Sequence, residues 1–105
     1  MSTREYFCEV VTVGYASPAN KKAGLMIQLW NYTYYKGFNQ WFCVPEACKE
    51  EILTVALASI SDATKVIVGI EDPGGYDHPE EFSEIKSLYV YNSNTRANPK
   101  TIPLE

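Results

Sequence analysis

Histidine is almost absent from this sequence, and cysteine is scarce. The single histidine is His78, and the three cysteines are Cys8, Cys43 and Cys48. A zinc site needs paired ligands of these types, and no second pair complements Cys43 and Cys48. No serine or cysteine lies in a nucleophile motif, so we expect His78 to be an exposed loop residue rather than a catalytic base. The sequence therefore predicts a protein that is not an enzyme and uses no metal or other cofactor.

Basic residues are a minority, and long apolar runs are missing. Nine Lys and Arg stand against 13 Asp and Glu, which gives a formal net charge of −4. Nucleic-acid binding and docking to anionic membranes both depend on clustered positive charge. No apolar run is long enough to span a bilayer, and the first residues show no secretory signal. The sequence predicts neither a nucleic-acid partner nor membrane insertion.

Hydrophobic residues are plentiful, at 46% of the chain, and aromatic residues reach 13%. Many of them fall into short segments rich in Val, Ile, Tyr and Phe, which are typical of β-strands. The acidic segment 72–84 contains Pro and Gly and is expected to be an irregular loop. The predicted strands are residues 5–15, 24–31, 40–44, 64–71 and 85–92.

One long helix is predicted over residues 46–61. Pro45 suits the first helical position because its missing N–H costs nothing there. Glutamates crowd the first turns, where the helix dipole favours negative charge. Beyond them the segment is apolar around most of its circumference, so we expect burial on more than one side, either by strands or by another subunit. Leu57 is accordingly expected at a buried apolar site.

The order of three strands, one helix and two strands is that of the OB-fold, a five-stranded Greek-key barrel. The alternative is an open α+β sheet with the helix packed on one face. Residues 1–92 are expected to form this single domain. Residues 93–105 are polar and contain Asn and Pro, so they are expected to be a mobile C-terminal tail.

Four short segments carry a resemblance to a known family. They are Tyr6-Phe7-Cys8, Phe42-Cys43, Ala47-Cys48 at the helix start, and Lys65-Val66-Ile67-Val68 after the helix. In this order they resemble the B subunits of one-A/five-B bacterial toxins, in the pertussis and subtilase-cytotoxin branch. The resemblance implies an OB-fold, a ring of subunits and binding of cell-surface glycans. No residue here matches the family's sugar-contacting serine, and the C-terminal half lacks the late cysteine usual in that branch.

The cysteines bear on the compartment of the protein. If the protein is exported, we expect one disulfide, from Cys8 to Cys43 or from Cys8 to Cys48, because the first and third strands come close in a barrel. A Cys43–Cys48 bridge is the alternative, although Pro45 stiffens the loop between them. An odd number of cysteines equally fits a reduced cytosolic protein. The protein is expected to be secreted if it is toxin-like, and otherwise cytoplasmic.

An aromatic and polar cluster surrounds the connection between the second and third strands. Sugar rings pack their C–H faces on aromatic rings, and their hydroxyls need amide or hydroxyl partners. The alternative is that Trp30 and Trp41 face each other across the hairpin and enter the core. The predicted ligand-binding residues are Trp30, Tyr32, Tyr34, Tyr35, Asn39 and Trp41.

Together these patterns favour a non-enzymatic binding module that recognises a glycan or a protein and forms a homo-oligomer. The ligand contacts are expected to come from the aromatic cluster and not from the acidic segment 72–84. The alternative function is a cytosolic structural or regulatory protein-interaction domain without a small ligand. An OB-type single-strand binder would also use exposed aromatics, but the net charge of −4 weighs against it.

Overall fold

A computed structural model describes residues 2–32 and 37–104. It contains five strands, one short 3-10 helix and one α-helix, so the predicted mostly β fold with a single long helix is confirmed. The predicted strand at 40–44 begins earlier, at Phe38. The elements are β1 (Thr3–Ala16), β2 (Gly24–Asn31), β3 (Phe38–Cys43), η1 (Glu46–Cys48), α1 (Lys49–Asp62), β4 (Lys65–Glu71) and β5 (Ile85–Val90).

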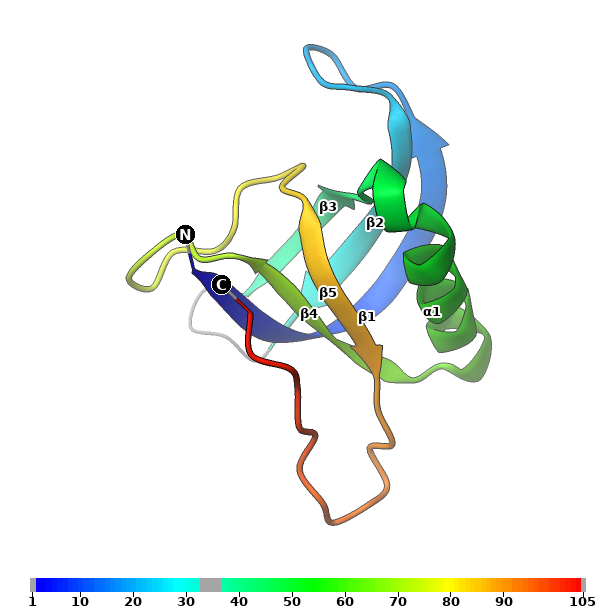
Figure 1. The fold of residues 1–105 in the computed structure, drawn as a ribbon, viewed down its shortest axis with the longest axis vertical. Coiled ribbons are helices and arrows are strands. Elements are labelled where there is room, and N and C mark those ends of the chain that lie inside the picture. The colour runs from blue at the N-terminus through cyan, green and yellow to red at the C-terminus, as the bar shows by residue number, and fades with distance from the viewer. Residues whose placement is uncertain (1, 33–36, 105) are drawn as a thin grey trace.

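The strands form one curved antiparallel sheet in the order β3-β2-β1-β4-β5 (Figure 1). The long strand β1 lies at its centre and pairs with β2 along one half and with β4 along the other. A register shift between Val10 and Thr12 marks a β-bulge, which bends the strand and increases its twist. The sheet is not closed into a barrel, which fits the open α+β alternative.

The two edges of the sheet approach each other at the end of β3. Cys43 of β3 and Glu84, just before β5, form an isolated parallel bridge. Beside it, the Phe82 N–H donates to the Trp41 carbonyl at 2.7 Å, and the Cys43 N–H donates to the Ser83 carbonyl at 2.9 Å. The end of the 72–84 loop therefore covers the outer edge of β3 and pairs polar groups that an edge strand would otherwise expose.

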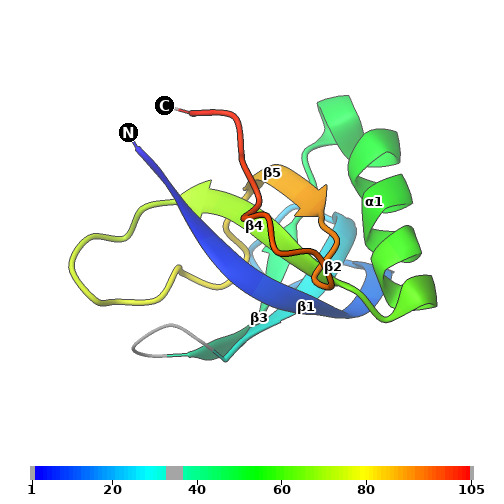
Figure 2. The same cartoon turned by 90° about the horizontal axis from the view of Figure 1, so that it is seen from below.

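The core fills the concave face of the sheet, and α1 covers one end of it (Figures 1 and 2). The helix buries a single stripe, made by Ile52, Ala56 and Ser59 at helical spacing. The hydrophobic residues of the core cluster are Tyr6, Cys8, Ile27, Leu29, Phe38, Phe42, Ile52, Ala56, Val66, Val68, Ile70 and Ile85.

The burial predicted for the helix is wrong within the single chain. Leu57 is 49% exposed and Ile60 is 41% exposed, because the sheet packs against one side of α1 only. The helix also starts later than predicted, at Lys49, since residues 46–48 form the separate turn η1. It ends at Asp62, and the following Ala63 adopts the left-handed conformation with φ 53°.

The C-terminal residues turn back toward the N-terminus, and the two chain ends lie close together in both views (Figures 1 and 2). The Tyr89 hydroxyl accepts a hydrogen bond from the Ile102 N–H at 3.3 Å. The expected mobility of this tail stays a prediction. In the part of the chain that the structure describes, no helix has both the length and the apolar character needed to cross a bilayer.

Candidate functional site

Alternate residues of β2 and β3 point away from the core and form a continuous outer face. In the strand register Trp30 lies opposite Asn39, and Gln28 lies opposite Trp41. The two tryptophans are therefore diagonal neighbours on the outer side of the sheet. Trp30 is 44% exposed and Trp41 is half-buried. The alternative in which both tryptophans face each other and enter the core is not what the structure shows.

Trp30 and Tyr32 form an aromatic pair on this face. Their ring centroids are 5.1 Å apart with an interplanar angle of 50°. Tyr32 is 40% exposed, so the pair presents ring surface to solvent. Four of the predicted ligand residues, Trp30, Tyr32, Asn39 and Trp41, thus lie on one surface. Tyr34 and Tyr35 lie outside the described residues.

Charged residues from two other strands border the aromatic pair. Glu9 of β1 lies between Trp30 and Lys65 in the register of the sheet. The Lys65 Nζ lies 4.8 Å from the centroid of the Tyr32 ring, within the range of a cation–π contact. A hydrogen bond with Tyr32 raises the pKa of Lys65, and the negative charge of Glu9 adds to this effect. A positive charge is therefore held at the rim of the aromatic pair.

A chain of hydrogen bonds links three polar side chains across the same face. The Thr12 hydroxyl donates to Gln28 Oε1 at 2.9 Å. Gln28 Nε2 in turn donates to Asn39 Oδ1 at 2.8 Å. The polar edge of the aromatic surface is thereby fixed by neighbouring strands rather than by a loop.

Close packing and one buried side-chain amide stabilise the residues on either side of the β2–β3 connection. The Asn31 side chain is 1% exposed, and its Nδ2 donates to the Phe7 carbonyl at 2.8 Å. Gly37 lies so close to the strand that an added Cβ would be 2.7 Å from the Asn31 carbonyl oxygen. Only glycine fits this approach without a backbone shift, which helps set where β2 ends and where Tyr32 lies.

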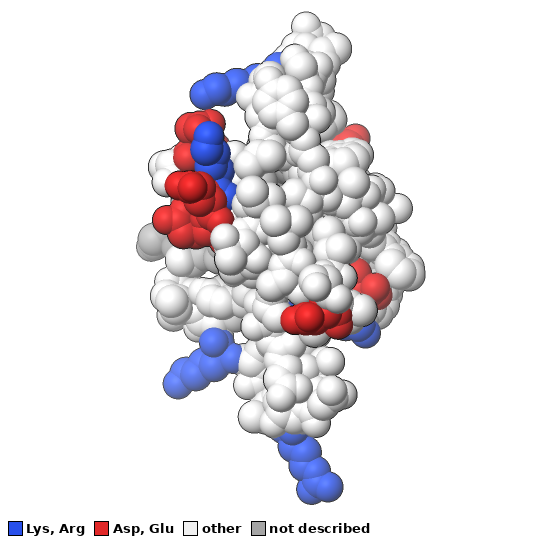
Figure 3. All heavy atoms as spheres, turned by 90° about the vertical axis from the view of Figure 1, so that its right-hand side faces the viewer, with Lys and Arg blue, Asp and Glu red and all other residues white. Residues whose placement is uncertain are grey.

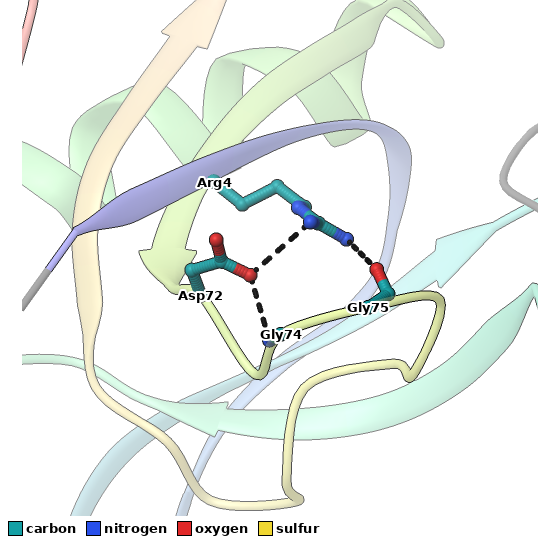
Figure 4. Close-up of polar contacts among 4 residues, drawn as sticks. All are labelled: Arg4, Asp72, Gly74 and Gly75. Carbon is teal, nitrogen blue, oxygen red and sulfur yellow. Dashed lines mark hydrogen bonds and ion pairs between the residues drawn. The ribbon is translucent and has the colours of Figure 1, made fainter.

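The acidic segment 72–84 is irregular, as predicted, but it is anchored at both ends. At its start, Asp72 Oδ1 accepts a hydrogen bond from the Gly74 N–H and pairs with Arg4 Nη2 at 3.3 Å (Figure 4). Arg4 Nη1 donates to the Gly75 carbonyl at 3.0 Å. The loop is thus fastened to the beginning of β1.

His78 and its neighbours fasten the middle of the loop to β3. The His78 side chain is exposed, as expected, and its Nδ1 lies 3.1 Å from Gln40 Nε2. Its ring lies 6.5 Å from that of Phe38, and the adjacent Pro79 is buried. These contacts give His78 a packing role. Among the described residues, no cluster of His, Cys, Asp and Glu is arranged to hold a metal ion.

All three cysteines are free in the structure, and the disulfide expected for an exported protein stays a prediction. Cys8 lies in the core, whereas Cys43 follows the core residue Phe42 and so points to the opposite face of the sheet. A Cys8–Cys43 bridge would have to cross the sheet. Burial raises the pKa of the Cys8 thiol to about 12, despite a hydrogen bond with Asn31. Burial also raises the pKa of Cys43.

Sequence reasoning missed four members of this outer face: Thr12, Gln28, Glu9 and Lys65. The alternation of β2 places Gln28 on the same side as Trp30, so the sequence pattern could have predicted Gln28. Lys65 and Glu9 join the face only through strand pairing between distant segments. The bulge after Val10 shifts Thr12 into register with Gln28.

The fold and the face define a class: an open antiparallel β domain with one covering helix and an exposed aromatic–amide surface on β2 and β3. No family model, curated protein or solved structure matches the chain. The resemblance to toxin B subunits therefore stays a prediction.

Proposed function

We propose that the outer face of β2 and β3 binds a glycan. The observation that carries this proposal is the exposed Trp30–Tyr32 pair next to the Asn39 amide. Aromatic rings accept the C–H face of a sugar, and an amide serves its hydroxyl or carbonyl groups. In the OB-fold, whose order of elements this chain shares, the face of strands two and three is a recurrent surface for oligosaccharides and oligonucleotides. The net charge of −4 favours the former.

The position of Trp30 and Asn39 on strands also supports a binding role. Binding groups held by regular elements are placed more accurately than groups on loops. A depression of 180 Å³ lies elsewhere, lined by residues that include Gly24, Met26, Cys43 and Glu84, and it does not include the aromatic pair. Glycan binding by stacking needs an exposed platform rather than a deep cavity.

A glycan array with the wild-type protein and Trp30→Ala tests this proposal. Tyr15→Ala is the matched control, because Tyr15 is 72% exposed at the far end of β1. We expect Trp30→Ala to lose most of the binding while its thermal stability changes by less than about 1 kcal/mol. The control should bind like the wild type. Equal binding by both variants, or no binding to any glycan on the array, would contradict the proposal.

We also propose that the outer side of α1 contacts a second copy of the chain. Leu57 and Ile60 of α1 are each more than 40% exposed. The face that carries α1 is mostly uncharged (Figure 3). Each copy carries a net charge of −4, so two copies repel each other. This repulsion is smallest where the surfaces that meet carry few charges. The molar mass in solution tests this contact.

A further inference from the structure

We propose that Thr12 and Gln28 are positioning residues that hold Asn39 as a hydrogen-bond donor, and that the outer face therefore selects neutral sugars bearing an acetamido group. This inference rests on the proposed glycan-binding function.

Two hydrogen bonds determine which way the Asn39 side-chain amide is oriented. Gln28 Oε1 accepts from the Thr12 hydroxyl, which turns Gln28 Nε2 toward Asn39. Asn39 Oδ1 accepts from that Nε2, so the acceptor of the Asn39 amide is occupied. Within the described ranges, 2–32 and 37–104, the Asn39 Nδ2 has no hydrogen-bond partner. The exposed Asn39 side chain thus offers a ligand two N–H donors.

The indole ring beside the Asn39 donor belongs to Trp30. Asn39 is directly opposite Trp30, and directly opposed side chains have Cβ atoms about 4.5–5.5 Å apart. A ligand group that touches both needs an apolar part for the ring and an acceptor for the amide. An acetamido group supplies a methyl and a carbonyl oxygen within that span. A simple hydroxyl supplies an acceptor but no methyl.

Charge also bears on which ligand fits this face. Glu9 lies in the same row of the sheet, next to Trp30, and the whole chain carries a net charge of −4. The Glu9 carboxylate lies next to Lys65 in this row and offsets its positive charge, so the face offers an anionic ligand no net positive charge. Lys65 is already engaged with Tyr32, through the cation–π contact and a hydrogen bond. A neutral acetamido sugar therefore fits the face better than an acidic sugar.

Two oligosaccharides with the same backbone provide the test. Chitotriose carries an acetamido group on each ring, and cellotriose carries a hydroxyl at the same position. We expect the wild-type protein to bind chitotriose more tightly by roughly three- to tenfold, the worth of one neutral hydrogen bond with its packing. Asn39→Asp keeps an acceptor for Gln28 but presents an acceptor to the ligand, so it should lose the preference.

The positioning role is tested by Thr12→Val and its rescue by Thr12→Ser. Thr12→Val removes the donor that orients Gln28, so the preference for chitotriose should fall, and Thr12→Ser should restore it. The side-chain amide NMR signals of Gln28 and Asn39 should shift in Thr12→Val without any ligand and return in Thr12→Ser. A merely structural role would not produce this rescue.

The results separate the two proposals. If Trp30→Ala abolishes binding but Thr12→Val and Asn39→Asp retain the preference, the inference is overturned and the glycan-binding face stands. If the wild-type protein binds both trisaccharides equally, the inference is also overturned. If no glycan binds at all, both proposals fail.

Discussion

At the scale of single residues, the face and the core use the same side-chain types for different purposes. Asn31 and Asn39 both lie beside the β2–β3 connection, yet Asn31 is buried against the Phe7 carbonyl and Asn39 is exposed beside Trp30. The difference follows from the two-residue period of a strand, which sends neighbouring side chains to opposite faces. The presence of an asparagine in this hairpin therefore does not by itself show that the residue contacts a ligand.

This pair gives a matched prediction. Asn31→Ala removes a buried amide that donates to the Phe7 carbonyl, in a part-buried hydrogen bond, and should lower the free energy of unfolding by roughly 1–3 kcal/mol. Asn39→Ala removes an exposed amide and should change it by less than about 0.5 kcal/mol. Urea unfolding of both variants measures the difference. Equal losses would mean that Asn39 is structural.

Cys8 gives a prediction in alkaline solution. Burial raises its pKa from 9.0 to about 12 in the folded protein. The unfolded chain loses this proton at lower pH than the folded chain, so the contribution of Cys8 to stability is complete below pH 9 and is lost as the pH rises toward 12. The free energy of unfolding should therefore fall more steeply with pH in the wild type than in Cys8→Ala. Parallel pH profiles would contradict a buried neutral thiol.

At the scale of elements, the backbone conformation of the residue after α1 lowers the stability of the protein slightly. Ala63 adopts the left-handed conformation with φ 53°, while its N–H and that of Thr64 bond to carbonyls of the last turn. A residue with a Cβ pays about 1–2 kcal/mol in this conformation, and glycine does not.

Ala63→Gly should accordingly stabilise the protein by about 1 kcal/mol. Ala58→Gly is the matched control, because Ala58 is an exposed residue in the helix interior, where glycine costs about 1 kcal/mol. Thermal melts should therefore move in opposite directions. A fall in melting temperature for both variants would show that the left-handed end is not a source of strain.

The elements themselves could largely be predicted from the sequence, but their surroundings could not. Strand β2 has the predicted bounds, because its alternation is regular and Gly24 and Asn31 mark its ends. The sheet covers only one side of α1, and an apolar circumference does not specify which side that is; burial of the other side by a second subunit stays a prediction. The composition of the candidate face could be predicted in part. Alternation places Trp30 on the less apolar side of β2, whereas Glu9 and Lys65 join the face through strand register and Thr12 joins it through a bulge, which the local sequence does not encode.

At the scale of the whole molecule, the mostly uncharged face that carries α1 and the aromatic face of β2 and β3 are separate surfaces. We expect Leu57→Asp to remain folded, because Leu57 is half exposed in the single chain, but to have a lower molar mass in solution than the wild type. Glu50→Gln is a suitable control at the exposed start of the helix. A wild-type protein that is monomeric at high concentration, or an unchanged mass for Leu57→Asp, would contradict the proposed contact.

The central claim is that the outer face of β2 and β3 binds a glycan, and a proton–nitrogen NMR titration tests it most directly. The sequence contains only two tryptophans, so the indole N–H signals of Trp30 and Trp41 report on this face alone. On addition of chitotriose, or of the tightest glycan from the array, both indole signals should move in a saturable way while the amide signals of α1 stay in place. Saturable binding that moves the α1 signals and leaves both indoles unchanged would contradict the account.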